Sequence, residues 1–161
     1  MGLGSLTRRQ WLLAIAALCV AGVVAALAGQ YGFDMRPCPW CILQRIFFIL
    51  IALICLAGAA GRSATVHRAA AAATVAISLL GIAAALYQHF VAAKSSSCNL
   101  TLADKIITAL HVDALVPSLF EVTGSCADAV VSMLGVPFDF WSLGLFFVVG
   151  AAAVGVLMRR D

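Results

Sequence analysis

The chain has 161 residues, of which 64% are hydrophobic and only 11% are charged, and its formal net charge is +3. Soluble domains average about 25% charged residues, so this chain has too little polar surface for a water-soluble globule and is expected to be a membrane protein. The small net charge, with no basic stripe along the sequence, excludes nucleic acid as an expected partner.

Four continuous apolar segments are each long enough to cross a bilayer as a helix, which takes about 20 residues. In chain order they are residues 11–29, 42–60, 70–92 and 138–158. They lack the alternation of membrane barrel strands, which also need only about ten residues. The sequence therefore predicts an all-α membrane protein, in which residues 1–161 form one domain built as a four-transmembrane-helix bundle.

The basic residues give the expected orientation of these spans. Six arginines precede the first span, lie between the second and third, or follow the fourth: Arg8, Arg9, Arg62, Arg68, Arg159 and Arg160. All six fall on one side of a four-span bundle, which the positive-inside rule makes cytoplasmic. Both termini are then expected in the cytoplasm, and two loops, residues 30–41 and 93–137, are expected on the outer side.

The beginning of the chain has a second interpretation. "TRRQWLL" resembles a twin-arginine signal, and "ALA" at 26–28 resembles a cleavage site. The apolar run is longer than the core of a usual signal, which has about 7–15 residues, so we expect this segment to stay as the first span. Cleavage would still leave residues 30–41 on the outer side.

Six cysteines fall into two groups. Cys19 and Cys55 lie within spans and are expected to act as small apolar side chains. The other four fall on the expected outer side: Cys38 and Cys41 at the first loop, and Cys98 and Cys126 in the second. The outer face of a bacterial inner membrane is oxidising, so these four residues point to disulfide chemistry.

The outer cysteines have three possible uses. A zinc site usually has two closely spaced pairs, whereas 27 residues separate Cys98 from Cys126. Structural disulfides that brace the loops remain a second possible use, above all for the second pair. A disulfide between Cys38 and Cys41 closes too small a loop to stabilise the fold much, and Cys-x-x-Cys pairs are more often redox-active.

Arg45 stands inside the second apolar segment, where a charge is costly. It follows Cys41 by four residues, so the two side chains share a helix face, with Arg45 about 6 Å deeper. It could snorkel to the surface, or its charge could serve a bound anion or an electron acceptor. At this depth the natural acceptor is a lipid-soluble quinone, which Ile42, Phe47 and Phe48 could wall.

With these residues the sequence resembles the DsbB family of disulfide-generating proteins of bacterial inner membranes. The resemblance is carried by "PCPWCILQR" at 37–45, by Cys98, and by "GSCADAVVSMLGVPFDFWSLGLF", which begins at Gly124. It covers nearly the whole chain, with four spans, two outer loops and a cysteine pair in each. It implies an oxidoreductase whose cysteine pairs are periplasmic.

The resemblance also implies a relay. A reduced DsbA-like periplasmic oxidoreductase would attack a Cys98–Cys126 disulfide at Cys98, and the released Cys126 would attack Cys38. Cys41 would then contact the quinone, either ubiquinone or menaquinone, with Arg45 assisting. Family members also place a histidine near the quinone, and His89 stands at the matching place, although it could equally be a wetted interfacial residue beside Tyr87.

The second loop contains the segment 102–120, whose apolar positions predict a short amphipathic helix on the membrane surface. Three alternatives to the relay enzyme remain. The chain could be a structural membrane protein with disulfide-braced outer loops or a metal-binding membrane module. It could also be similar to the vitamin K epoxide reductases, in which the Cys-x-x-Cys lies later in the chain and Arg45 would lack a counterpart.

Overall fold

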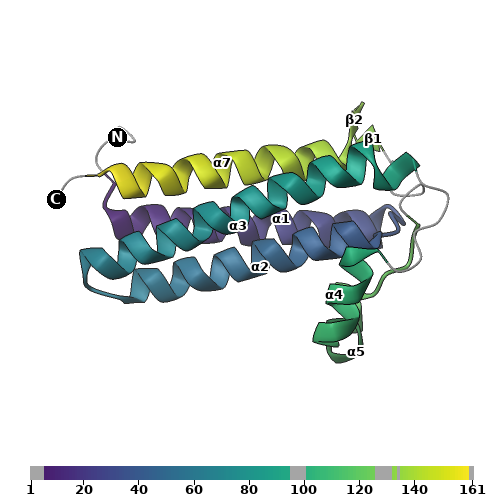
Figure 1. Cartoon of the computed structure of the whole chain (residues 1–161), viewed down its shortest axis with the longest axis horizontal. Helices are drawn as coiled ribbons and strands as arrows, with labels where there is room; N and C mark the ends of the chain where they lie inside the picture. The colour runs from purple at the N-terminus through teal and green to yellow at the C-terminus, as the bar shows by residue number, and fades with distance from the viewer. Residues whose placement is uncertain (1–5, 95–100, 126–131, 134, 160–161) are drawn as a thin grey trace.

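The computed structural model describes residues 6–94, 101–125, 132–133 and 135–159. Four long helices lie side by side and form most of the molecule (Figure 1). They are α1 (Arg8–Gly32), α2 (Pro39–Ala60), α3 (Ala64–Phe90) and α7 (Phe138–Met158). Each is long and apolar enough to cross a membrane. The chain is therefore a multi-pass membrane protein with a four-helix bundle, and each of the four expected spans falls within the helical segments described here.

Local sequence signals explain where these helices begin. The hydroxyl of Thr7 accepts a hydrogen bond from the backbone of Gln10, whose side chain in turn accepts from Thr7, which makes a capping box at the start of α1. Ser63 caps α3 in a similar way. The third helix begins six residues before the expected span because this cap comes early, which leaves a short turn after α2.

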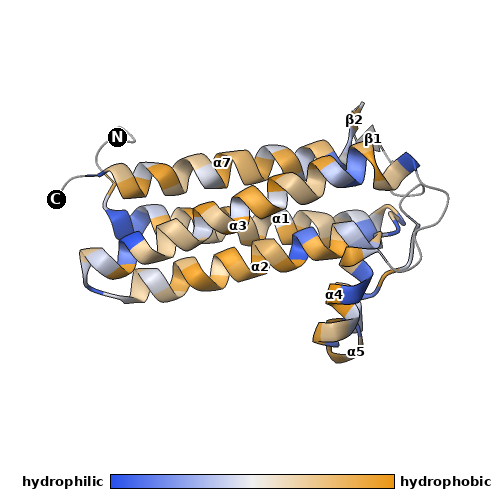
Figure 2. Ribbon diagram, viewed as in Figure 1, coloured by the Kyte–Doolittle hydropathy of each residue, from blue (hydrophilic) through white to orange (hydrophobic). Residues whose placement is uncertain are grey.

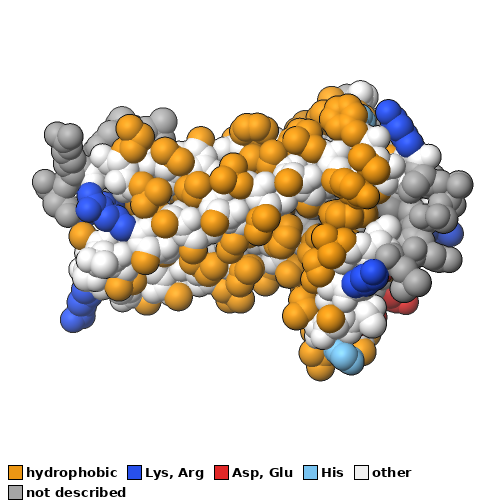
Figure 3. Space-filling model, in the orientation of Figure 1, with side chains coloured by type: hydrophobic (Ala, Val, Ile, Leu, Met, Phe, Trp, Pro, Cys, Tyr) orange, Lys and Arg blue, Asp and Glu red, His pale blue; other side chains and the backbone are white. Residues whose placement is uncertain are grey.

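The lipid-facing surface of the bundle is apolar. Hydrophobic residues cover the length of all four long helices (Figure 2), and the space-filling view shows the basic side chains near the two ends of the molecule (Figure 3). Leu53, Leu79 and Phe147 are examples of large apolar side chains that remain exposed on α2, α3 and α7. Such a surface is stable against lipid tails rather than water.

One end of the bundle gathers basic residues from three helices. The guanidinium of Arg8 donates to the backbone carbonyl of Arg159, and that of Arg68 approaches the same carbonyl at 3.4 Å. These contacts bring the beginning of α1, the beginning of α3 and the end of α7 together. We call this end the terminal end and the opposite one, where α2 begins, the loop end.

The loop end carries the short elements that connect α3 to α7. In chain order they are η2 (Ala92–Lys94), α4 (Leu102–Leu110), α5 (Val112–Leu115), α6 (Pro117–Phe120), β1 (Ser132–Met133) and β2 (Val136–Pro137). The two strands pair in antiparallel fashion. Helices α4 and α5 project from the side of the bundle (Figure 1).

The segment predicted as one amphipathic helix forms three shorter helices. The first, α4, keeps the expected two faces: Ala103 and Ile107 are buried, whereas Lys105 and Thr108 are exposed. It ends at His111, which has a left-handed backbone with φ of 51°. A second interruption precedes Pro117, because proline disfavours a helical conformation in the residue before it.

The core of the bundle depends on a close approach between α3 and α7. The ring of Phe146 on α7 stacks on that of Phe48 on α2, with centroids 4.0 Å apart. Gly81 on α3 faces the Phe146 ring, and a Cβ added there would lie 2.3 Å from its Cε1 atom. Glycine at position 81 is therefore what lets the aromatic pair sit between three helices.

We expect the substitution Gly81→Ala to lower the Tm of the purified protein by roughly 5 °C, because overfilling a packed core costs about 1–3 kcal/mol. Gly155→Ala is the matched control, since Gly155 lies in α7 with open space where its Cβ would be. Thermal unfolding in one detergent measures both. Equal Tm values for the two variants would contradict the role given to Gly81.

Candidate functional site

The Cys38–Cys41 pair stands at the first turn of α2. Cys38 is the N-cap residue, and its sulfur accepts a hydrogen bond from the backbone N–H of Cys41. Pro39, with its fixed φ, suits the first helical position. The two Sγ atoms are 2.9 Å apart, so a small movement would allow a disulfide to close. The helix start thus holds both sulfurs in reach of each other.

Arg45 lies one turn further along α2 and is only 5% exposed. Its Nη1 atom donates to Oε1 of Gln30 on α1 at 3.0 Å and to the backbone carbonyl of Leu119 on α6 at 2.5 Å. Both acceptors are neutral, and in the described part of the chain no carboxylate pairs with Arg45. The side chain therefore does not snorkel to the surface but is held between two other elements.

One nitrogen of this guanidinium remains unused. The Nε atom of Arg45 is buried and has no hydrogen-bond partner among the described residues. A buried donor without a partner is costly, and here it belongs to a cation that pairs with no carboxylate among the described residues. Such a group is suited to a ligand atom that carries or gains negative charge.

Cys41 and Arg45 line the same cavity, of about 400 Å³. Its wall is mainly apolar and comes mostly from α1, α2 and α7, with Val23, Phe48 and Leu145 among the apolar members; α3 and residues 35–37 of the first loop complete it. Its polar members in the bundle helices are Cys41, Gln44, Arg45, Gln88, Asp139 and Ser142. An apolar cavity with a few convergent polar groups is the usual form of a small-molecule site.

Of the three wall residues expected from the sequence, only Phe48 lines the cavity. Ile42 is buried against Ile107 and Phe120 instead. Phe47 packs partly in the bundle core and partly against the buried group around Cys38 and Trp40. The helical repeat explains the difference, because residues 41, 45 and 48 share one face of α2, whereas 42 and 47 lie on others.

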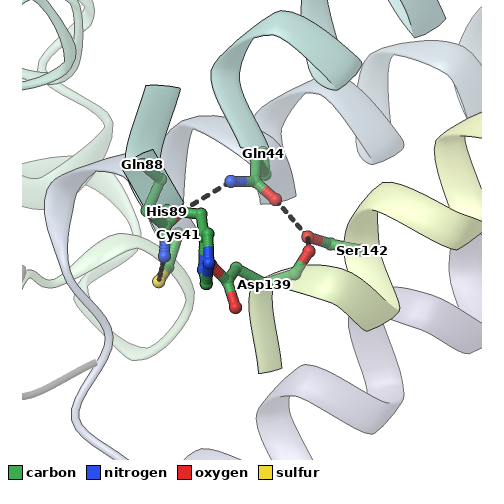
Figure 4. A network of polar contacts seen from close by, with 6 residues as sticks. All are labelled: Cys41, Gln44, Gln88, His89, Asp139 and Ser142. Atoms are coloured by element: carbon green, nitrogen blue, oxygen red, sulfur yellow. Dashed lines mark hydrogen bonds and ion pairs between the residues drawn. The ribbon is translucent and has the colours of Figure 1, made fainter. Parts of the chain in front are cut away.

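A chain of side-chain amides meets Cys41 inside the cavity (Figure 4). Nε2 of Gln88, on α3, donates to Sγ of Cys41 at 3.2 Å. Nε2 of Gln44 donates to Oε1 of Gln88 at 2.7 Å, and the hydroxyl of Ser142, on α7, donates to Oε1 of Gln44. The sequence assigns no role to any of these three residues, although Gln44 belongs to the motif at 37–45 and polar side chains inside spans are a recognised signal of function.

His89 is placed beside the cavity rather than in its wall. Its Nδ1 atom lies 2.7 Å from Oδ2 of Asp139, at the start of α7, and its side chain is 28% exposed. The rings of Phe90 and Phe140 contact it edge-on. Asp139, but not His89, is among the lining residues, and Oδ1 of Asp139 is buried without a partner among the described residues. His89 is thus connected to the cavity wall by its contact with Asp139.

The second loop is tied to the first directly before Cys38. The backbone N–H groups of Thr123 and Gly124 both donate to the carbonyl of Pro37, at 3.2 and 3.1 Å. A Cβ added to Gly124 would lie 2.7 Å from the carbonyl oxygen of Arg36, so only glycine fits this contact. We call residues 123–124 the strap. Cys98 and Cys126, the other two expected site residues, lie outside the described residues.

Comparison with known proteins gives a consistent result. Residues 8–156 match the family described as disulfide bond formation protein DsbB. Disulfide bond formation protein B 1 of Pseudomonas syringae pv. syringae (strain B728a) is 31% identical over 157 residues, which cover 94% of this chain and 90% of the relative. Disulfide bond formation protein B of Burkholderia pseudomallei (strain 1106a) is 32% identical over 158 residues, which cover 97% and 93%. With a match that spans nearly its whole length, the chain belongs to the DsbB family.

Proposed function

We propose that this chain is an oxidoreductase that reoxidises a DsbA-like periplasmic partner and passes the electrons to a membrane quinone, which generates disulfides de novo. The electrons would travel through Cys98 and Cys126 and then through Cys38 and Cys41. One observation carries the proposal: Cys41 and Arg45 line a single apolar cavity between membrane-spanning helices, and the sulfur of Cys38 lies 2.9 Å from that of Cys41.

The residues around the cavity fit a quinone. Its volume of about 400 Å³ lies within the range of about 300–1,000 Å³ that is usual for small-ligand sites, and the apolar wall suits a ring with a hydrocarbon tail. The unpaired Nε of Arg45 suits an oxygen that gains negative charge. A bound quinone would accept two electrons and two protons and leave as quinol. Ubiquinone and menaquinone share the two ring oxygens, so both are candidates.

The chain's own cysteines would exchange disulfides in four steps. A partner thiolate attacks Cys98, which breaks the Cys98–Cys126 bond and leaves Cys126 as a thiolate. Cys126 attacks Cys38, which breaks the Cys38–Cys41 bond and releases Cys41. The second partner thiolate then frees Cys98 and leaves the partner oxidised. Cys98 finally attacks Cys126, which breaks the Cys126–Cys38 bond, restores the Cys98–Cys126 disulfide and releases Cys38. The dithiol of Cys38 and Cys41 now holds the two electrons.

The strap supports the second of these steps. It joins the backbone at Thr123 and Gly124 to Pro37, which directly precedes Cys38. Cys126 follows Gly124 by two residues in the sequence. The contact ties residues 123–124, which come shortly before Cys126 in the sequence, to the residue directly before Cys38.

His89 and Asp139 would serve proton transfer at the cavity. Asp139 lines the cavity, and its partner His89 is partly exposed at the loop end of α3. Quinol formation consumes two protons, and a partly exposed imidazole bonded to a lining carboxylate is a suitable route for them.

The proposed location is the bacterial inner membrane, with both termini in the cytoplasm and the cysteine pairs in the periplasm. The arginines that meet at the terminal end, Arg8, Arg68 and Arg159, would face the cytoplasm under the positive-inside rule. The loop end would then face the oxidising periplasm, where disulfides persist.

The central prediction concerns Cys41. We expect the wild-type protein to couple oxidation of a reduced DsbA-like partner to reduction of ubiquinone or menaquinone, tested in parallel, and we expect Cys41→Ser to abolish quinone reduction. Cys55→Ser is the matched control, because Cys55 is buried in the bundle core and contacts Thr74. Wild-type turnover by the Cys41 variant would refute the relay. Absence of turnover by the wild-type protein itself would favour a structural protein with braced loops.

Arg45→Ala is expected to raise the KM for quinone by about 10–100-fold, which matches the loss of one charged hydrogen bond. The control Gln30→Met removes a neutral partner of Arg45 but keeps the cation, so its KM should change little. Steady-state kinetics at varied quinone concentration and thermal unfolding are measured on both variants. A large fall in Tm with a normal KM for Arg45→Ala would show that the arginine serves packing instead.

Gly124→Ala tests the strap. Its Cβ would collide with the Arg36 carbonyl, so we expect electron transfer from the DsbA-like partner to slow by about tenfold. Reduction of the quinone by a small dithiol that attacks the Cys38–Cys41 pair directly should keep its rate. The control is Gly32→Ala, at the end of α1, where a Cβ meets nothing within 4 Å. An equal loss in both assays would point to general damage and contradict the strap.

A further inference from the structure

Two buried side-chain amides in the bundle interior form a series of hydrogen bonds that ends at the sulfur of Cys41. The side chains of Gln44 and Gln88 are 3% and 4% exposed, and buried amides of this kind are stable only when their donors and acceptors are paired. They are joined in series, from Ser142 through Gln44 and Gln88 to Cys41, across three helices (Figure 4). The series therefore has a direction, with its donor end at the cysteine.

The opposite direction is equally available to the same side chains. A carboxamide has an oxygen on one branch and an NH₂ group on the other, and a half-turn of its last torsion exchanges them in the same space. After both amides turn, Gln88 presents its oxygen to Cys41, its NH₂ group faces the oxygen of Gln44, and the NH₂ group of Gln44 faces Ser142. The heavy-atom distances that pair the groups remain the same.

Ser142 can terminate either direction. In the observed one its hydroxyl donates to Oε1 of Gln44. The backbone carbonyl of Asp139 lies 2.9 Å from the same hydroxyl, so after reversal the hydroxyl can donate to that carbonyl while it accepts from Gln44. A hydroxyl is both donor and acceptor and rotates freely, which makes serine a suitable end for a chain that reverses.

We propose that Gln88 is a catalytic residue at the end of a reversible hydrogen-bond chain, in which Gln44 and Ser142 position it. Gln88 donates a hydrogen bond to Cys41 when the cysteine is a thiolate and accepts one from it when the cysteine is a thiol. Cys41 must pass through both forms in each cycle, so this inference rests on the redox role given to Cys41 above. A sulfur in a disulfide is only a weak acceptor. The chain therefore stabilises the reduced cysteine, in either protonation state, more than the oxidised one.

A redox equilibrium tests this without quinone or partner. The purified chain is equilibrated in buffers of reduced and oxidised glutathione, in which two glutathione thiols convert the Cys38–Cys41 disulfide to a dithiol and form one glutathione disulfide. After acid quenching and alkylation, mass spectrometry gives the oxidised fraction of the peptide with both cysteines. No quinone or partner takes part, so the measurement remains valid even if the proposed relay is wrong. An equilibrium that does not shift in the variants would overturn the role of the hydrogen-bond chain but not the relay.

Gln88→Met keeps the length of the side chain but removes the amide, and we expect it to shift the equilibrium towards the disulfide by about tenfold, which is about 30 mV for a two-electron couple. Gln44→Met should shift it in the same direction by roughly threefold, because Gln88 loses its orientation. Ser78→Ala is the control, because it removes a hydroxyl that is also buried in the bundle but is not part of the hydrogen-bond chain. It should leave the equilibrium unchanged. A wild-type equilibrium in Gln88→Met overturns the proposal.

The reversal itself has a separate signature. Side-chain ¹⁵N labelling of glutamine gives resonances from Gln10, Gln30, Gln44 and Gln88 alone. In the disulfide form we expect the NH₂ protons of Gln44 to contact Gln88. In the dithiol form at acidic pH we expect them to contact Ser142 instead. Gln10, at the far end of α1, serves as the unaffected control. Identical contacts for Gln44 in both forms would overturn the reversal.

Discussion

The buried guanidinium of Arg45 constrains much of the loop end. A charge at the centre of a bilayer costs roughly 2.5–3.5 kcal/mol on insertion scales, and less near its edge, and this one is only 5% exposed. Its acceptors come from α1, through Gln30, and from α6, through the carbonyl of Leu119. To keep this cation hydrogen-bonded, the chain must hold the end of the first helix and part of the second loop against α2. The wall of the cavity and the approach to the cysteine pair follow from that arrangement.

One face of α2 then brings together groups with different tasks. Residues 41, 44, 45 and 48 recur at helical spacing and place a sulfur, an amide, a cation and an aromatic ring along the same cavity. Each group is completed by another helix: Gln88 of α3 meets the sulfur, Ser142 of α7 meets the amide of Gln44, and Phe146 of α7 stacks on Phe48. A shift of α3 or α7 would therefore alter chemistry and packing together.

The sequence predicted the features that depend on a single continuous segment of the chain. Long apolar runs gave the four spans, and the spacing from Cys41 to Arg45 placed both residues on one helix face. The partners of these residues come from distant parts of the chain, so hydropathy and spacing could not find them. The sequence points to His89 rather than to its neighbour Gln88, although Gln88 is the one of the two that contacts Cys41. The single amphipathic helix expected over 102–120 failed at His111 and Pro117, where backbone conformation outweighs the apolar pattern.

The contact between Arg45 and Leu119 uses a main-chain oxygen. Every amino acid supplies that atom, so replacement of the Leu119 side chain leaves the acceptor in place, and an alanine scan of the second loop would pass over one of the closest contacts of the buried cation. The contact is sensitive instead to the path of the backbone. Insertions, deletions or the loss of the proline that starts α6 would disturb it, while the residue at position 119 remains free to vary in that respect.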